Sequence, residues 1–222
     1  STADNNKTKI AAHYQQLRQH LQQQGIVDGI YFSSCNDRRG CATIIIPHNP
    51  HPLLQSTASI QHHAREWGLI LTTKDITIFN VYINPERQLK NAMTKSLIND
   101  INKICTKITT DDHNIAITGD FNLCWEDVQS TVVRSIKTPI NYIPTQHNTA
   151  RAPTFTNVNN NKSKSAQYNH NNNQQYNIKT SCIDHVITIT PMRSTQCIEV
   201  FDNTNVINGL NVQHKPIVTS LY

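Results

Sequence analysis

An acid and an amide that stand two residues apart are the strongest chemical signal in the sequence. Asp120 and Asn122 belong to the segment Gly-Asp-Phe-Asn at 119–122, which follows the apolar run Ile-Ala-Ile-Thr at 115–118. Such a run predicts a buried strand, so both side chains are expected where that strand ends and a loop begins. Carboxylate and amide oxygens suit a hard cation such as Mg²⁺, which serves phosphate chemistry. Gly-Asp is also a common turn, so a plain turn explains these residues equally well when they are taken alone.

Two later segments carry groups for the same chemistry. Asp184 stands at the head of the apolar run at 186–189, and His214 precedes a predicted final strand in the segment Gln-His-Lys-Pro at 213–216. Phosphodiester hydrolysis needs an activated water, charge stabilisation on the phosphoryl oxygens and help for the leaving oxygen. We assign His214 as the group that handles the proton, and Asp184 as the carboxylate that fixes its tautomer and stabilises its cation. The structural alternatives are a surface histidine and a strand-capping acid.

These segments, in this order, resemble the endonuclease/exonuclease/phosphatase superfamily, whose fold is that of deoxyribonuclease I. Within it, the sequence is most similar to the apurinic-type endonuclease domain of non-LTR retrotransposons. Three more segments match in the expected order: a Gly-led apolar strand at 39–46, Asn-Val-Tyr-x-x-Pro at 80–85 and Pro-Thr-Phe at 153–155. The resemblance implies an α/β fold, a four-layer sandwich of two packed mixed β-sheets flanked by helices, with residues 1–222 as a single domain.

The resemblance also implies the chemistry and the partners. Family members nick DNA by magnesium-dependent hydrolysis, with Mn²⁺ as the alternative metal, and leave a 3′ hydroxyl that primes reverse transcription. Asp120 and Asn122 would hold the metal, orient the attacking water and bind the scissile phosphate, which the Tyr82 hydroxyl would contact. The weaker candidates for substrate contacts are Thr154, Asn84 and Arg87. The expected partners are DNA, with RNA as the alternative, and a reverse transcriptase domain of the same polyprotein; the expected location is the nucleus.

Two anionic groups of the family's metal site have no counterpart here. Family members begin with strands that carry an Asn and then the principal Glu ligand, whereas this chain passes from Ser1 almost at once into a predicted helix at 10–21. Glu66 and Glu86 fall in the wrong contexts, and Gln213 stands where the family has an acid. Oxygen ligation of Mg²⁺ weakens as carboxylates are lost. The chain is either a fragment or a decayed copy, and we expect weak or absent activity from it alone.

Other interpretations stay open at this point. The chain could be a non-catalytic nucleic-acid-binding module on the same fold, or a phosphatase or RNA-directed hydrolase of the superfamily, because a fold does not fix its substrate. Tyr82 has an alternative role as a strand-end aromatic that packs on the core. His185, beside Asp184, is unusual, because the family has an apolar or aromatic residue at that position.

Composition narrows the class of protein. A chain of 222 residues with 37% hydrophobic content fits one domain with a packed sheet core, and no run approaches the roughly 18 apolar residues of a membrane span. We therefore expect a soluble, intracellular protein. The net charge of +5 suits an acidic partner, although a solvated surface explains it equally well. The six cysteines lack Cys-x-x-Cys spacing, which favours buried thiols over zinc or disulfides.

Hydrophobic spacing predicts the elements that position these residues. Apolar residues at steps of three and four predict one helix from Ile10 to Leu21 and a second with its face at 93, 97, 101, 104 and 108. Short runs of Ile, Val and Thr predict strands at 29–33, 41–46, 69–72, 76–82, 115–118, 183–190, 197–201 and 216–221, with 73–75 as a hairpin turn. The Asn-rich tract 157–177 predicts a mobile surface loop, an interpretation we favour over DNA contacts by Lys162 and Lys164.

Overall fold

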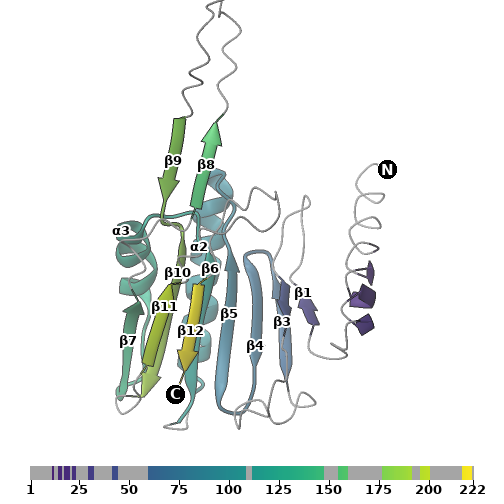
Figure 1. Cartoon of the computed structure of the whole chain (residues 1–222). Helices are drawn as coiled ribbons and strands as arrows, with labels where there is room; N and C mark the ends of the chain where they lie inside the picture. The colour runs from purple at the N-terminus through teal and green to yellow at the C-terminus, as the bar shows by residue number, and fades with distance from the viewer. Residues whose placement is uncertain are drawn as a thin grey trace, which may run out of the picture.

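The computed structural model contains one large β-sheet, helices and three smaller strand pairs (Figure 1). It describes residues 12, 15–16, 18–20, 22–23, 30–32, 42–44, 60–108, 112–147, 155–159, 177–191, 196–200 and 217–221. The described residues between 12 and 23 are helical, as predicted, but the apolar face of that helix lies outside the described set. Within the described part of the chain, no helix has the length and apolar character that a membrane crossing requires.

Six strands form the main sheet in the spatial order β3-β4-β5-β6-β10-β7. Only β5 and β6 run parallel, and every other neighbouring pair is antiparallel. A parallel pair needs a long crossover connection, which here contains the helix α2 (Arg87–Cys105). The strands are β3 (Gln61–Arg65), β4 (Gly68–Thr72), β5 (Ile76–Tyr82), β6 (Asn114–Asp120), β10 (Asp184–Pro191) and β7 (Tyr142–His147).

The predicted hairpin between β4 and β5 is confirmed. The Thr73 N–H donates to the Ile76 carbonyl at 2.9 Å, and the Thr73 hydroxyl oxygen accepts from the Ile76 N–H at 3.1 Å. A short polar side chain that satisfies nearby backbone groups favours such a turn. The turn fixes a register in which Ile70 faces Phe79, so both residues meet the core.

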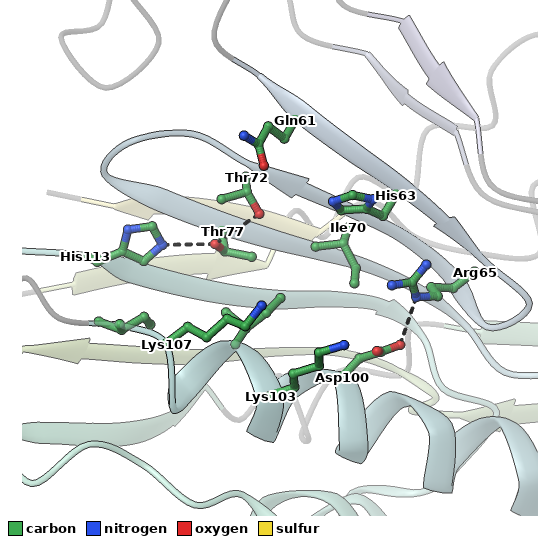
Figure 2. A pocket seen from close by; sticks show the side chains of 12 residues that line it. Gln61, His63, Arg65, Ile70, Thr72, Thr77, Asp100, Lys103, Lys107 and His113 are labelled. Carbon is green, nitrogen blue, oxygen red and sulfur yellow. Dashed lines mark hydrogen bonds and ion pairs between the residues drawn. The ribbon is translucent and has the colours of Figure 1, made fainter.

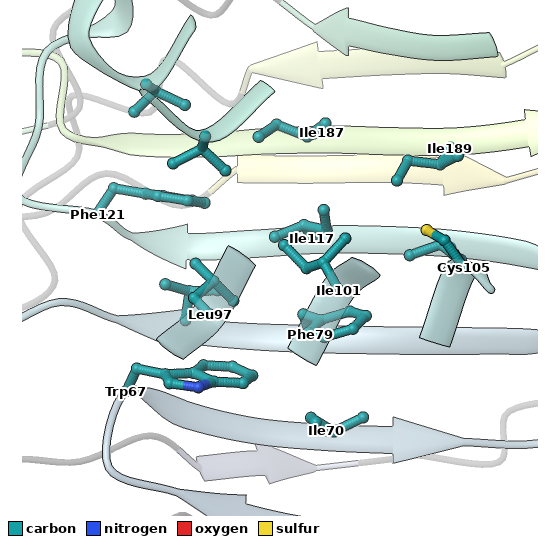
Figure 3. Packing of buried hydrophobic residues seen from close by; sticks show 14 of the residues in the cluster. Trp67, Ile70, Phe79, Leu97, Ile101, Cys105, Ile117, Phe121, Ile187 and Ile189 are labelled. Carbon is teal, nitrogen blue, oxygen red and sulfur yellow. The ribbon is translucent and has the colours of Figure 1, made fainter. Parts of the chain in front are cut away.

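The hydrophobic core lies between α2 and the main sheet (Figure 3). Leu97 and Ile101 of α2 are fully buried. They belong to one cluster with Phe79 of β5, Ile117 of β6 and Ile187 of β10. The rest of the predicted helix face is partly buried against the same cluster: Met93, Ile104 and Ile108. The predicted face is therefore confirmed, although the helix itself ends at Cys105.

A second helical segment follows β6 and contributes to the same core. It begins as α3 (Trp125–Asp127), continues as a π-helical turn (Val128–Val132) and ends as a 3₁₀ turn (Val133–Ser135). Val128 and Val132 are fully buried members of the core cluster. The sequence analysis did not predict this segment, because two valines four residues apart are too short a pattern to define a helix face.

Three antiparallel strand pairs lie outside the main sheet. The mixed α/β class that the sequence predicted is confirmed by the six-stranded mixed sheet and its helices. In Figure 1, β11 and β12 lie in front of that sheet, on the face opposite α2, where a sandwich would place its second sheet. The pairs are β1 (Ile30–Phe32) with β2 (Ala42–Ile44), β8 (Phe155–Asn159) with β9 (Asn177–Ser181), and β11 (Gln196–Val200) with β12 (Ile217–Leu221).

The prediction of a loop across 157–177 is wrong at both of its ends. Asn157 and Asn159 lie in β8, where they pair with Lys179 and Asn177 of β9. A ladder satisfies backbone N–H and C=O groups whatever the side chains are, so polar residues can form it. The stretch between the two strands lies outside the described residues.

The thiols of Cys105, Cys124 and Cys182 are free. Cys105 is buried in the core, and this burial raises the pKa of its thiol to about 11. The prediction of a buried thiol is therefore confirmed for Cys105. Cys124, just before α3, is exposed, and Cys182 is partly exposed.

Candidate active site

Three predicted site residues lie in one row across the central strands of the main sheet. Tyr82, at the end of β5, pairs with Asp120, at the end of β6. Asp120 pairs in turn with Asp184, the first residue of β10. Neighbouring strands lie about 4.8 Å apart, so the register places three residues distant in sequence side by side.

The three side chains also share one face of the sheet. Side chains alternate between the two faces along a strand, and the neighbours of this row point into the core beneath α2. Val81 precedes Tyr82, and Phe121 follows Asp120, and both are buried members of the core cluster. Tyr82, Asp120 and Asp184 therefore project from the opposite face, and all three are partly exposed. This row can present a phenol and two carboxylates to a single ligand.

Hydrogen bonds hold the loop after β6 to the end of β6, to the residue that follows β5 and to α2. The Asp120 carboxylate accepts the Asn122 N–H at 2.9 Å, and the Asn122 side-chain amide donates to the Ile83 carbonyl at 2.8 Å. Asn122 has φ of +48°, a left-handed conformation that asparagine tolerates better than most residues. The Lys90 ammonium of α2 donates to the Asn122 carbonyl at 2.7 Å. With its nitrogen committed to Ile83, Asn122 has its amide oxygen left to meet a ligand.

Gly119 permits the close approach of β5 and β6 at the site. It has φ of +138°, and a Cβ placed there would lie 2.0 Å from the Val81 carbonyl oxygen. Only glycine fits that conformation and that spacing. The glycine of Gly-Asp-Phe-Asn is therefore a structural requirement for the position of Asp120.

His185 is a core residue and not a proton carrier at the sheet surface. Its ring is fully buried, 5.6 Å from the Phe121 ring and 5.3 Å from the Trp125 ring. Its Nε2–H donates to the Leu123 carbonyl at 2.8 Å, and its Nδ1 is buried without a hydrogen-bond partner. Desolvation by burial lowers the pKa of the imidazole. The ring packs on Phe121 and Trp125 and holds the loop after β6 through the Leu123 carbonyl.

Of the weaker candidates for substrate contacts, Asn84 and Arg87 lie at or just before the start of α2, and Thr154 lies outside the described residues. The Asn84 side-chain oxygen accepts the Glu86 N–H at 2.9 Å, so Asn84 shapes the turn into α2. Arg87 is the first residue of that helix and is exposed. Contacts of Asn84 and Arg87 with a substrate stay predictions. The residues of the predicted site that lie outside the described set are His214, Gln213 and Thr154.

Glu66 and Glu86, the two acids that the sequence patterns did not favour as ligands, are not members of this row. Glu66 is in the turn between β3 and β4, and Glu86 is the residue before α2. Sequence reasoning missed Lys90, which holds the loop carbonyl. No motif marks this lysine; its only signal is its place one turn into the helix that follows the Tyr82 strand.

The donor atoms of the row suit a hard cation. Mg²⁺ is usually bound by one or two carboxylates together with waters and substrate phosphates. Asp120, Asp184 and the amide oxygen of Asn122 supply that chemistry. Among the described residues, no three His, Cys, Asp or Glu side chains gather closely enough to hold a metal without further ligands. The residues therefore fit an open Mg²⁺ site that substrate completes, and do not fit a closed cage.

Comparisons with known proteins add little to these observations. No protein-family model matches the chain, and no curated protein matches it. Among solved structures, truncated Caenorhabditis elegans TDP2 matches at 15% identity with a TM-score of 0.35, over 59% of this chain and 49% of that one. D. rerio TDP2, complexed with single strand DNA product, matches at 15% identity with a TM-score of 0.32, over 66% of this chain and 56% of that one. The chain thus spans about half the length of the structures that it matches.

Proposed function

We propose that this chain is a metal-dependent phosphodiesterase domain that nicks DNA. The observation that supports this most is the Tyr82–Asp120–Asp184 row beside the fixed Asn122 loop. One phenol, two carboxylates and an amide oxygen on one face can bind a phosphate and a hard cation together. The finer assignment, to the retrotransposon endonucleases of the endonuclease/exonuclease/phosphatase superfamily, rests on the sequence motifs alone.

Each residue of the row has a separate role in the proposed hydrolysis. The Tyr82 hydroxyl donates a hydrogen bond to a non-bridging phosphate oxygen, where charge develops. Asp120, whose carboxylate accepts the Asn122 N–H, orients the attacking water or binds a cation. When bound, Mg²⁺ would neutralise phosphate charge and make water more acidic. Asp184 would accept a hydrogen bond from His214, fix its tautomer and stabilise its cation, as the sequence motif implies.

A nicking assay tests this function directly. Supercoiled plasmid is incubated with the protein in Mg²⁺, in Mn²⁺ and in EDTA, and the open-circular product is quantified. We expect Asp120→Asn, Asp184→Asn and His214→Ala each to lower nicking by about 100-fold, and Tyr82→Phe by less. Asp112→Asn is the matched control, because Asp112 is exposed just before the opposite end of the same strand.

The outcomes separate the proposed function from its alternatives. Nicking that EDTA and all three variants abolish, and that Asp112→Asn leaves intact, supports the proposal. Salt-dependent DNA binding without nicking contradicts it and points to a non-catalytic module. Turnover of RNA or small phosphate esters, but not of plasmid, contradicts the choice of DNA as substrate. A nicking rate unchanged by Asp120→Asn would show that a contaminating nuclease produced the product.

A further inference from the structure

A polar pocket lies on the α2 face of the main sheet, the face opposite the Tyr82–Asp120–Asp184 row. It has a volume of about 450 Å³ and opens between β3, β4, β5 and the C-terminal half of α2 (Figure 2). Thr77, near the start of β5, lines it, and five residues of strand, about 17 Å, separate Thr77 from Tyr82. Side chains two residues apart on a strand point to the same face, so Thr77 shares the α2 face with the core residue Phe79. Tyr82 points to the other face. The pocket is therefore distinct from the proposed catalytic site.

The lining of this pocket carries excess positive charge. Its one carboxylate, Asp100, accepts the Arg65 Nε–H at 3.0 Å and the Trp67 indole N–H at 3.2 Å through the same oxygen. Arg65 and Asp100 therefore balance one another. The remaining cations of the lining are Lys103 at the end of α2 and Lys107 in the turn after it, and Figure 2 shows both between the helix and the strands.

Lys103 lies in the last turn of α2, and Lys107 lies in the turn that follows the end of the helix at Cys105, so two like charges that repel one another line the same pocket. Among the described residues, no carboxylate lies within ion-pair distance of either ammonium group. Two unpaired lysines side by side on the wall of a concave pocket attract an anion, which would relieve their repulsion.

The opposite wall is a chain of hydrogen bonds that presents hydroxyl groups. The His113 ring bonds to the Lys74 carbonyl through Nδ1 at 3.0 Å and to the Thr77 hydroxyl through Nε2 at 2.9 Å. The Thr77 hydroxyl is 3.3 Å from the Thr72 hydroxyl, so the chain ends at Thr72 in the pocket lining. His113 is buried and engaged at both ring nitrogens, and this wall is therefore ordered before any ligand binds.

We propose that this pocket binds a phosphate group, which Lys103 and Lys107 hold by charge and the Thr72–Thr77 wall holds by hydrogen bonds. Lysine binds phosphate as a point charge, and hydroxyl groups accept or donate as the ligand requires. The volume lies in the range of small-molecule sites, so the pocket accommodates a nucleotide-sized ligand. The phosphate belongs either to a free mononucleotide or to a nucleic-acid strand that crosses the edge of the sheet at β3.

The test measures binding in EDTA, where metal-dependent cleavage cannot occur. The probes are dAMP and a fluorescein-labelled single-stranded dT oligonucleotide, titrated with the full chain by calorimetry and by fluorescence anisotropy. The variant is Lys103→Gln with Lys107→Gln. The matched control is Lys95→Gln with Lys137→Gln, which removes the same charge from exposed positions outside the pocket. Thermal melts check that each double variant folds.

We expect the pocket variant to weaken binding of at least one probe by roughly tenfold or more, while the control changes it less than about twofold. If the ligand is a nucleic-acid strand, the slope of log K against log salt should fall by about 1.4, which corresponds to two lost phosphate contacts. Binding of dAMP but not of the oligonucleotide would identify a free nucleotide as the source, and the reverse result a strand. Equal losses in the two double variants, or no binding of either probe by the wild type at millimolar concentration, would overturn the proposal.

This inference does not depend on the proposed nicking activity. Loss of probe binding with unchanged nicking per bound plasmid, in the Lys103 and Lys107 variant, would support the pocket as a separate site. Nicking per bound plasmid that falls in step with probe binding would refute that separation.

Discussion

The buried imidazole of His185 should make the stability of this fold depend on pH below neutrality. Burial lowers the pKa of His185 from its ordinary value of 6.5, whereas the hydrogen bond to Leu123 and the charges of Asp184 and Glu126 act more weakly in the opposite direction. A proton added to the ring would go to Nδ1, which is buried and lacks an acceptor. The folded chain therefore resists protonation more strongly than the unfolded chain does.

The sign and the size of the effect follow from this difference. The contribution of the neutral His185 ring to the free energy of unfolding is complete above pH 6.5, where the ring is neutral in both the folded and the unfolded chain. It declines as the pH falls, because only the unfolded chain takes up the proton. Each pH unit below 6.5 costs at most about 1.4 kcal/mol until the folded ring itself protonates. Between pH 6.5 and 5.0 the loss is at most about 2 kcal/mol, a sizeable part of the roughly 5–15 kcal/mol of a typical domain.

Urea denaturation followed by tryptophan fluorescence, at pH 7.5 and pH 5.0, measures this contribution. His185→Phe keeps an aromatic ring between Phe121 and Trp125 but removes the titrating group. At pH 7.5 the variant should lose about 1–3 kcal/mol, because the Leu123 carbonyl loses its donor. It should nevertheless lose up to about 2 kcal/mol less than the wild type on going to pH 5.0.

The chain has eleven histidines, so the comparison between variants isolates His185 from the others. His20→Gln is the matched control, because His20 is helical and exposed. This control should lose the same stability between the two pH values as the wild type. If the wild type and His185→Phe lose equal stability between pH 7.5 and pH 5.0, the account of His185 as a neutral buried ring is refuted.

Three further substitutions have outcomes that the structure specifies. Gly119→Ala should destabilise the fold by more than about 3 kcal/mol in urea titrations, because its Cβ would overlap the Val81 carbonyl; a loss below 1 kcal/mol would contradict the strand spacing described here. Leu97→Ala should cost about 2–5 kcal/mol by the same measurement, since Leu97 is fully buried under the sheet. Lys90→Met keeps the aliphatic stem but removes the bond to the Asn122 carbonyl, so plasmid nicking should fall while the melting temperature changes little; unchanged nicking would show that the loop needs no such anchor.

Within the main sheet, the sequence predicted the four central strands and missed the two edge strands, β3 and β7. The runs at β4, β5, β6 and β10 are apolar because each passes through the core, and hydrophobic spacing finds them. β3 has the sequence Gln-His-His-Ala-Arg and exposes nearly every side chain, since it joins the sheet only through backbone bonds to β4. β7 contains Pro144 and lies at the other end of the sheet's strand order. Such strands depend on their neighbours, which a local pattern cannot show.

Much of the candidate site was predictable as a set of residues but not as a geometry. An acid after an apolar run predicts a strand-end carboxylate, and this is where the structure places Asp120 and Asp184. Their pairing, together with that of Tyr82, depends on a register between segments far apart in sequence. The hydrogen bond from the Asn122 side-chain amide to the Ile83 carbonyl was also not predictable, because it requires the ends of β5 and β6 to be adjacent.

The position of the row follows from the way the three central strands are connected. Because β5 and β6 run parallel, the α2 crossover brings their carboxyl ends to the same edge of the sheet. Because β10 runs antiparallel to β6, it contributes its first residue to that edge. At these positions the strands leave the core, so the polar side chains of Tyr82, Asp120 and Asp184 are desolvated less than they would be in the core, while Val81 and Phe121 beside them stay buried. A polar substitution at Val81 or Phe121 should therefore disturb the fold, whereas conservative changes within the row should alter chemistry and leave stability nearly unchanged.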